Sequence, residues 1–376
     1  MKKVVLIPGI RFHVERYFDY YRNIHSGIQI YVITSSPYYK FNNKNFRYLY
    51  SPQLFLILQR LFKIQGNSYF KKFDSYLFQF FASIYIFFIK PDILHVWGSF
   101  AHRIFNKNDN YLKIIERSST FLTKQLDIIK QENKKLGLSI KKIPDSFISN
   151  NIKELKMTDI IITPSEYAKN SFPAVFQDKI TVIYPFSKNC FDYSYKTRDK
   201  NKFILGYVGA NIVVKGLYYL LDIFISSKIF FNSHLWLKIN RESLKDHEGL
   251  LAIIDNNPNI IIIGLDDDME KFYQSLDCIV QPSIDDGFNM VTIEALSVGV
   301  PSFVSDKMGS SEFLKELIPE NIFNLSNDEA LASLINNLNK KDLLNQSIVI
   351  RKKYKYLFNK FTMQNNLNFN QLIKNA

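Results

Sequence analysis

Two carboxylates in the segment QPSIDDGFNMVTIEALSVGVPSFVSD, residues 281–306, have a spacing that suits the binding of hydroxyl groups. Asp286 precedes a helix-compatible run, MVTIEALSVG, and Glu294 lies eight positions later within that run. We expect the helix to end at Gly299, because a glycine just past a helix with a proline soon after, here Pro301, is a common stop signal. Eight positions make a little over two helical turns, so both carboxylates are expected on one face, where they can hold two sets of hydroxyl groups.

The turn that begins this helix, Gly287 to Met290, is suited to an anion. The first backbone N–H groups of a helix have no partner within it, and the helix dipole adds positive potential there. A diphosphate group fits such a site. The competing interpretation is that Asp286 is an ordinary capping carboxylate and Glu294 a glutamate on the helix surface.

A lysine at the start of a second predicted helix is suited to neutralising a phosphate group. Lys215 stands near the end of GYVGANIVVKG, residues 206–216, a strand and a loop that precede the helix-like run LYYLLDIF. A cation at this position stabilises negative charge that develops on a departing diphosphate. The alternative is a solvated lysine beside a turn glycine.

Runs of branched apolar residues alternate with helical stretches along the whole chain, and these elements must position the sites. Buried parallel strands are typically near-continuous apolar runs because helices cover both faces of the sheet, and the spacers here are long enough for crossover helices. The predicted fold class is therefore α/β, with two doubly wound, Rossmann-like domains. The expected strands are KKVVLIP, IQIYVIT, DILHVW, LKIIERS, DIIITPS and KITVIYP in the first half, and KFILGYVG, SHLWLKIN, NIIIIG, CIVQPS and PSFVSD in the second.

Two domains are the natural expectation for a chain of 376 residues. The segment from Ser187 to Lys202 is polar and charged, without a periodic pattern, and divides the chain. We expect an N-terminal domain at 1–190, a linker at 191–202 and a C-terminal domain at 203–350. A C-terminal helix at 351–376 is expected to cross back onto the first domain.

The positive charge of the protein is concentrated in its first half. Residues 1–190 hold 28 Lys and Arg against 13 Asp and Glu, a net charge of +15, whereas residues 191–376 hold 20 against 22, a net charge of −2. Such asymmetry indicates an anionic partner for one domain, either a nucleic acid or a membrane surface, unless it is simply a solvated lysine-rich surface. Residues 1–190 contain no RNP, KH or helix-turn-helix pattern, so we expect no nucleic acid as partner.

The apolar stretch Leu77 to Ile89 is thirteen residues long, which is too short for a transmembrane helix of about 20 residues. Together with Leu54 to Phe62 and nearby basic residues, it suggests that the first domain rests on an anionic membrane surface. The competing interpretation is a core helix before the strand ILHVW. The basic residues are Lys63, Lys71, Lys72 and Lys90.

Other features of the sequence exclude several classes of protein. Two cysteines, Cys190 and Cys278, are too few for a disulfide framework, and the N-terminal MKKVVLIPGI lacks the apolar core of a signal peptide. We therefore expect a cytoplasmic protein that is peripheral on the inner face of the cytoplasmic membrane. No CxxC, HExxH or Walker A sequence is present and no GxGxxG follows a strand, so neither a bound metal nor a dinucleotide cofactor is expected.

The two candidate sites together resemble the signature of retaining GT-B glycosyltransferases, the family 4-like glycosyl transferases group 1. That signature has an acidic residue, Gly and Phe, a few apolar positions, Glu-Ala and a closing Gly-Val-Pro, and this chain has Asp286 where the family usually has Glu. The resemblance implies three catalytic residues: Asp286 holds donor-sugar hydroxyl groups, Glu294 binds the nucleotide ribose and Lys215 faces the diphosphate. The donor-binding residues that it implies are Gly209, Lys215, Ile263, Gly264, Leu265, Asp286, Gly287, Phe288, Asn289, Met290 and Glu294, with residues 263–265 against the nucleotide base.

The first half resembles an acceptor segment of some bacterial polysaccharide glycosyltransferases, in which Glu-Arg-Gly-Ser follows a strand. Here the segment contains Glu116 and Arg117, followed by two serines, and the resemblance places both residues, with Gly9, in the acceptor side of the cleft. Many relatives have a histidine after the equivalent strand. His95 in ILHVW is an alternative for that role, although a lone histidine on a buried strand is usually structural.

Three further expectations concern residues near these motifs. The family commonly has a second basic residue before the lysine, where this chain has Val214, so either Lys215 acts alone or another arginine, such as Arg241, substitutes. Ser165, in the Pro-Ser turn of DIIITPS, is expected to cap the next helix. Asp266 to Asp268 are expected to form a helix N-cap cluster rather than a metal site.

The resemblance implies a hexosyl transfer from a UDP- or GDP-linked sugar to a glycan or lipid-linked acceptor in surface polysaccharide or lipopolysaccharide biosynthesis. It implies retention at the anomeric carbon by front-face attack and neither a cofactor nor a metal. Two alternatives remain. A catalytically inactive, sugar-nucleotide-binding subunit would explain why Val214 and Asp286 depart from the family pattern, and a basic nucleic-acid-binding protein would explain the charge.

Overall fold

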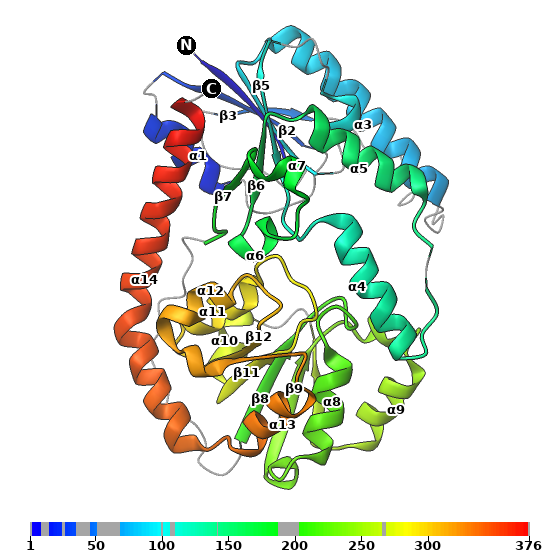
Figure 1. Cartoon of the computed structure of the whole chain (residues 1–376), viewed down its shortest axis with the longest axis vertical. Coiled ribbons are helices and arrows are strands. Elements are labelled where there is room, and N and C mark those ends of the chain that lie inside the picture. The colour runs from blue at the N-terminus through cyan, green and yellow to red at the C-terminus, as the bar shows by residue number, and fades with distance from the viewer. Residues whose placement is uncertain are drawn as a thin grey trace.

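The computed structural model arranges the chain as two parallel sheets, each flanked by helices and drawn one above the other in Figure 1. The α/β fold class with two Rossmann-like domains is therefore confirmed. The structure describes residues 2–8, 15–24, 27–34, 46–50, 68–98, 101–105, 110–140, 142–186, 203–264 and 268–374. Gly9, the segment Leu54 to Phe62 and the whole of the expected linker, 191–202, lie outside these residues.

The first sheet has seven parallel strands in the order β3-β2-β1-β4-β5-β6-β7. Alternate residues of strand β1 pack into two core layers. Val5 and Ile7 lie on one face of the sheet, and Val4 and Leu6 lie on the other. Helices cover both faces, and for that reason the strands are apolar throughout. The strands are β1 (Lys3–Ile7), β2 (Gln29–Thr34), β3 (Phe46–Tyr50), β4 (Ile93–Trp97), β5 (Leu112–Glu116), β6 (Ile160–Thr163) and β7 (Ile180–Val182). The helices are α1 (Glu15–Ile24), α3 (Ser68–Ile89), η1 (Ala101–Arg103), α4 (Leu122–Lys135), α5 (Asp145–Met157), α6 (Glu166–Lys169) and α7 (Ala174–Gln177).

The second sheet has six parallel strands in the order β10-β9-β8-β11-β12-β13. Its strands are β8 (Phe203–Val208), β9 (Ser233–Lys238), β10 (Ile260–Ile263), β11 (Cys278–Gln281), β12 (Ser302–Ser305) and β13 (Ile322–Phe323). Its helices are α8 (Leu217–Ser226), η2 (Phe230–Asn232), η3 (Arg241–Leu244), α9 (Glu248–Asn256), α10 (Met269–Gln274), α11 (Met290–Ser297), α12 (Ser311–Leu317), η4 (Pro319–Asn321) and α13 (Asp328–Asn336).

Two edge strands, β3 and β13, were not among the strands expected from the sequence. β13 is only two residues long, and β3 has the sequence FRYLY, in which Arg47 interrupts the apolar run. An edge strand has a neighbour on one side only and does not need the continuous apolar run of a central strand. The sequence signal at both edges is weak for this reason.

The last helix, α14 (Lys340–Lys374), is a single helix of 35 residues that joins the two halves of the molecule. It runs along one side of both domains in Figure 1, packing first on α11 and α12 and then on α1 and β7. Near its end the Asn365 side chain donates to Tyr184 O and accepts from Tyr184 N, both at 2.8 Å. The boundary that we expected at residue 350 falls inside this helix and not at its start.

Helix α3 has two apolar faces. Phe78, Ala82 and Ile86 point into the core of the first domain. The opposite face is exposed and carries a stripe of apolar, mostly aromatic side chains with helical spacing, which we call the α3 stripe. It consists of Tyr76, Phe80, Ile84, Phe87 and Phe88. Among the helices that the structure describes, none has both the length and the apolar character needed to cross a bilayer.

Phe369→Ala should lower the free energy of unfolding by about 3–5 kcal/mol. The Phe369 ring is fully buried at the end of α14 against Tyr17, Tyr20 and Tyr21, so the substitution leaves a cavity. Leu367→Ala, on the exposed side of the same helix, should change stability by less than about 0.5 kcal/mol. Denaturant unfolding of both variants measures the difference, and equal midpoints would contradict the docking of α14 on the first domain.

Candidate active site

Loops at the carboxyl ends of both sheets touch one another between the two domains. A Cβ atom on Gly287, which follows β11, would lie 2.7 Å from both the Ser118 O atom and the Ser119 Cα atom, which follow β5. A Cβ atom on Gly309, after β12, would lie 2.4 Å from Ser165 Oγ, after β6. Open parallel sheets bind ligands at the carboxyl ends of their strands, so this junction is the candidate site.

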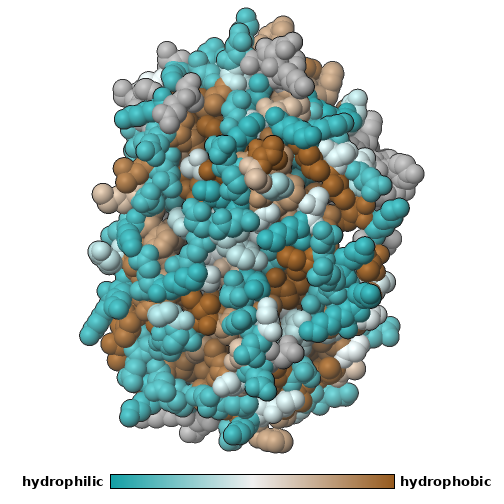
Figure 2. Space-filling model, in the orientation of Figure 1, coloured by the Kyte–Doolittle hydropathy of each residue, from teal (hydrophilic) through white to brown (hydrophobic). Residues whose placement is uncertain are grey.

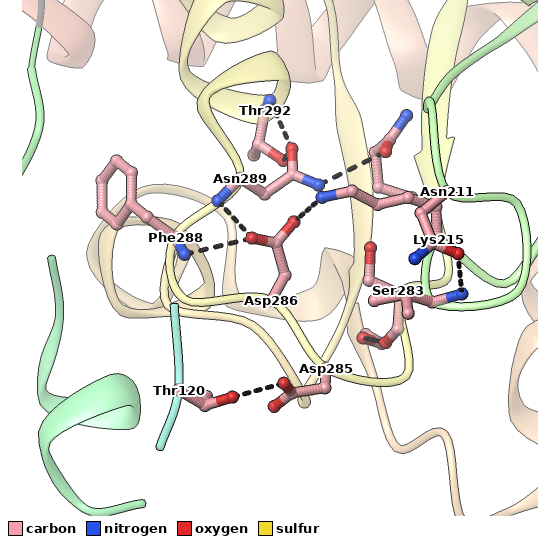
Figure 3. A network of polar contacts seen from close by, with 12 residues as sticks. Thr120, Asn211, Lys215, Ser283, Asp285, Asp286, Phe288, Asn289 and Thr292 are labelled. Carbon is pink, nitrogen blue, oxygen red and sulfur yellow. Dashed lines mark hydrogen bonds and ion pairs between the residues drawn. The ribbon is translucent and has the colours of Figure 1, made fainter. Parts of the chain in front are cut away.

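Lys215 and Asp286 form an ion pair at this edge of the second sheet (Figure 3). They come from the loops after β8 and β11, which are neighbouring strands. Their side chains are 25% and 12% exposed, so both remain within reach of a solute. Gly209 lies against the lysine, because a Cβ there would approach Lys215 Cβ to 3.0 Å. The structure therefore brings together two residues that the sequence placed 71 positions apart.

The loop before Lys215 is held by its own backbone and by the loop after β11. The Asn211 side chain accepts from Val214 N at 3.3 Å, and Ile284 N donates to Val214 O at 2.8 Å (Figure 3). The Val214 side chain is buried, with 7% of its surface exposed. Arg241, the substitute considered from the sequence, is held on the surface by both oxygens of Asp255 at 2.7 Å.

The start of α11 is capped from within the protein. Asp286 Oδ1 accepts from Phe288 N at 3.2 Å and Asn289 N at 3.1 Å (Figure 3). Asn289 has a φ of 67° and accepts from Thr292 N at 3.1 Å, so it is the N-cap. The backbone N–H groups of Phe288 and Asn289, which were expected to face a diphosphate, thus donate to Asp286 in this structure. The Phe288 side chain is buried in the core. The helix begins at Met290, as the sequence predicted.

Glu294 is half-buried on α11 and accepts from the Tyr273 hydroxyl, on α10, at 2.7 Å. Burial raises the pKa of the Glu294 carboxyl above its usual value, and the hydrogen bond from Tyr273 partly opposes that rise. Burial and the neighbouring Glu294 carboxylate also raise the pKa of Tyr273, so this hydroxyl stays a donor. Glu294 is therefore not a solvated surface glutamate.

The segment expected to contact the nucleotide base lies at the end of β10. Ile263 is the last residue of that strand and Gly264 follows it, whereas Leu265 lies outside the described residues. Lys238, only 2% exposed, donates to Gly264 O at 2.9 Å. The sequence analysis missed this lysine. The only sequence feature that marks Lys238 is its place as the last residue of the strand SHLWLK, at the carboxyl edge of the sheet. The expected capping role of Asp268 is confirmed, since it accepts from Glu270 N at 2.9 Å.

On the first-domain side of the junction, Glu116 and Arg117 line a cavity of about 190 Å³ at the carboxyl end of β5. The Arg117 guanidinium is held by Glu154 Oε2 at 2.8 Å and by Asn151 O at 3.3 Å. It also lies against Gly98, where a Cβ would approach Arg117 Nη1 to 2.4 Å. Arg117 therefore forms part of the cavity wall while its charge is paired within the domain.

His95 is a core residue of the first domain. Its side chain is fully buried, and its ring stacks on Trp97 at 4.4 Å and contacts the Tyr21 hydroxyl through Nδ1 at 3.3 Å. The nearest carboxylate to its other nitrogen is Glu116, at 3.8 Å. The structural interpretation of this histidine is therefore confirmed.

A second aspartate, Asp285, crosses the junction between the domains. Its carboxylate accepts from the Thr120 hydroxyl (Figure 3), and also from Gln125 Nε2 at 2.8 Å and from the Tyr167 hydroxyl at 3.0 Å. Ser165 caps α6 as expected, accepting from Ala168 N at 3.0 Å, and also donates to the carbonyl of Gly287 at 2.6 Å. The sequence analysis did not identify Asp285, because nothing but its place beside Asp286 marked it.

Metal ligands do not gather at this junction. Among the residues that the structure describes, no three or more His, Cys, Asp or Glu side chains are arranged to hold a metal ion.

The second half of the chain matches a known family. Residues 194–355 match the family model of glycosyl transferases group 1. Over 215 residues the chain is 28% identical to the capsular polysaccharide biosynthesis glycosyltransferase CapM of Staphylococcus aureus, covering 49% of this chain and 56% of that protein. It is also 28% identical over 173 residues to an uncharacterized glycosyltransferase of Methanocaldococcus jannaschii, covering 41% of this chain and 44% of that protein. The chain thus spans about half the length of the curated relatives it matches.

Solved structures share the fold over the whole chain. Sucrose-phosphate synthase from Thermosynechococcus elongatus aligns with a TM-score of 0.72 at 15% identity, covering 100% of both chains. HepE of Anabaena in complex with UDP and glucose aligns with a TM-score of 0.62 at 13% identity, covering 100% of this chain and 99% of that chain. The chain therefore shares the GT-B fold of these structures.

Gly216→Ala should destabilise the protein, whereas Gly249→Ala should not. Gly216 has a φ of 69°, which costs other residues about 1–2 kcal/mol, and a Cβ there would lie 1.9 Å from Pro282 O. Gly249 lies in α9 with nothing within 4 Å of an added Cβ, so alanine should stabilise it by up to about 1 kcal/mol. Thermal unfolding compares the two, and a wild-type melting temperature for Gly216→Ala would contradict the geometry of the Lys215 loop.

Proposed function

We propose that the protein is a retaining glycosyltransferase that moves a hexosyl unit from a nucleoside diphosphate sugar to a hydroxyl group of a glycan or lipid-linked acceptor. The observation that carries this proposal is the solvent-accessible Lys215–Asp286 pair at the carboxyl edge of the second sheet, beside the start of α11. The family match over residues 194–355 supports it. A structural neighbour, HepE, was solved with UDP and glucose, and a relative is named for capsular polysaccharide biosynthesis, which supports a UDP-sugar donor and a polysaccharide product.

Each site residue has a distinct role in this proposal. Lys215 holds the diphosphate and takes up the charge that develops on it. Asp286, which pairs with Lys215 in this structure, turns its carboxylate to the sugar hydroxyl groups when the donor enters. Glu294, with the Tyr273 hydroxyl as its partner, accepts hydrogen bonds from the ribose. The cavity that Glu116 lines in the first domain is assigned to the acceptor.

In the proposed transfer no side chain of the protein acts as a nucleophile, and atoms and charge balance. The bond from the anomeric carbon to the diphosphate breaks, and the acceptor oxygen bonds to that carbon on the same face. The acceptor proton passes to an oxygen of the leaving phosphate, so no base from the protein is required. A double displacement would need a carboxylate at the anomeric carbon, and the proposal assigns none of the described carboxylates to that task. We propose no metal cofactor, with Lys215 as the cation at the leaving group.

Donor binding and turnover of three variants test this assignment. Glu294→Gln should weaken binding of the UDP- or GDP-sugar by about tenfold to a hundredfold, because a charge-assisted hydrogen bond is lost. Lys215→Met should lower kcat by at least about tenfold, and Asp286→Asn should mainly lower turnover. Isothermal titration and initial rates measure these effects, and chelation by EDTA should leave the wild-type rate unchanged.

Two variants serve as controls for the lost charge. Lys245→Met removes an exposed lysine that pairs with Glu242, and Arg241→Met removes an arginine held by Asp255, so both should behave as wild type. Wild-type donor affinity and rate in all three site variants would refute the site. Donor binding without turnover or donor hydrolysis in the wild type would instead favour the inactive, sugar-nucleotide-binding subunit.

We further propose that the first domain binds the inner face of the cytoplasmic membrane through the α3 stripe. Phe87 and Phe88 are 72% and 76% exposed at the end of α3, which lies in the upper right part of Figure 1, and Figure 2 shows hydrophobic residues among hydrophilic ones on that side of the molecule. Exposed aromatic side chains of an amphipathic helix bury in the interfacial region of a bilayer without spanning it. The net charge of +15 on residues 1–190 favours anionic lipid.

Flotation with vesicles that contain phosphatidylglycerol tests the membrane proposal. Phe87→Glu/Phe88→Glu should lower the bound fraction at least about tenfold, because each buried phenylalanine contributes about 1.5–3 kcal/mol. Phe231→Glu, an 86% exposed phenylalanine of the second domain, is the matched control and should float as wild type. Binding should weaken with salt and need anionic lipid. Wild-type protein that stays unbound at low salt refutes the proposal.

A further inference from the structure

Asp285 is a buried carboxylate whose side-chain partners all belong to the other domain. It is 1% exposed and follows β11 of the second sheet. Its Oδ2 atom accepts from Thr120 and Gln125, at the start of α4, and its Oδ1 atom accepts from the Tyr167 hydroxyl on α6. None of these three partners carries a positive charge. A carboxylate in such a place is costly to bury, and only the donors of the first domain compensate for that cost.

The same residue is part of the chain that forms the donor site. Asp286 is its direct neighbour, and Gly287 follows, with its carbonyl bound by Ser165 and its Cα against Ser118. The backbone of Asp286 is fixed in turn by Lys307 O, which accepts from Asp286 N at 3.0 Å. The turn is therefore anchored within the second domain, and the Asp285 side chain links it to the first domain.

A second carboxylate of the second domain crosses the junction nearby. Glu312, in α12, accepts from Tyr167 N at 2.7 Å and from the Tyr184 hydroxyl at 2.9 Å. The two carboxylates bracket Tyr167, one at its hydroxyl and one at its backbone. Burial and the neighbouring Asp285 carboxylate raise the pKa of the Tyr167 hydroxyl, so it remains protonated and able to donate.

We propose that Asp285 is a positioning residue that couples closure of the two domains to assembly of the active site. In the closed arrangement Thr120, Gln125 and Tyr167 hold the carboxylate, and the turn at Gly287 is seated against the acceptor side. When the domains separate, water replaces the three donors and the first domain withdraws from the turn at Gly287, which stays anchored to its own domain through Lys307 O. The inference rests on the proposed function for its catalytic consequence, whereas the closure itself is independent of any substrate.

Distances between spin labels, one on each domain, test the closure directly. Val175→Cys and Phe231→Cys offer exposed label sites in the first and second domains, with Cys190→Ser to remove a native thiol. Asp285→Asn leaves one oxygen where the carboxylate has two, so an amide NH₂ must face a donor. This variant, and Tyr167→Phe in the other domain, should each add a population with a longer distance in the ligand-free protein.

Measurements of kcat and of the donor dissociation constant distinguish a positioning role of Asp285 from a loss of structure. Both variants should lower kcat by at least about tenfold while the donor dissociation constant changes less than about twofold, because the donor contacts lie in the second domain alone. The double variant should lose no more activity than the larger single loss, since both substitutions break one interaction. Asp277→Asn, which removes a carboxylate bonded to Ile204 N within the second domain, should keep the wild-type distance.

The outcomes are distinct for the two proposals. Wild-type distances in well-folded Asp285→Asn and Tyr167→Phe refute the coupling, and so do additive losses of kcat in the double variant. If the wild type binds no nucleotide sugar, the proposed function fails, but the ligand-free distances still decide whether Asp285 holds the domains together.

Discussion

The close approach of the turn at Gly287 to the backbone of Ser118 and Ser119 is the contact on which the arrangement of the candidate site depends. A single Cβ atom at Gly287 would have to sit 2.7 Å from atoms of the first domain. Because parallel strands place all their carboxyl ends at one edge, the loops after β5 and β11 can meet only if the two sheets face each other across this point. The long helix α14 holds the sheets in that relation, since it packs on both domains.

Carboxylates with different partners divide the chemistry of the junction. Asp286 pairs with the cation of Lys215, Glu294 takes a phenolic hydrogen bond from within its own domain, and Asp285 takes its donors from the other domain. The role of each carboxylate depends on its partner. A charged ligand can separate a partly exposed ion pair, whereas a buried carboxylate with neutral donors holds the surrounding structure in place. Two adjacent aspartates in the sequence thus have different partners, one a lysine of its own domain and the other neutral donors of the first domain.

The two halves of the chain also differ in what their surfaces offer. The first domain carries the excess positive charge and the exposed α3 stripe, while the second carries the match to the glycosyltransferase family. This division is consistent with a donor site built mainly from one domain and an acceptor that approaches along the other. A membrane-bound first domain would bring the cavity at Glu116 to a lipid-linked acceptor.

The sequence by itself determined the α/β fold class, all the central strands, the start of α11 and the motif residues of the second sheet. These follow from local signals: apolar runs, a helix stop at Gly299 and short spacings within one loop. The tertiary structure alone decided which residues far apart in the sequence meet, within each domain and across the junction. Asp285 and Tyr167 are 118 positions apart, Lys238 reaches Gly264 from a neighbouring strand, and Arg117 is neutralised by Glu154 on α5. Such pairings depend on how strands, helices and sheets pack against one another. No local sequence pattern encodes a contact between residues so far apart in the chain.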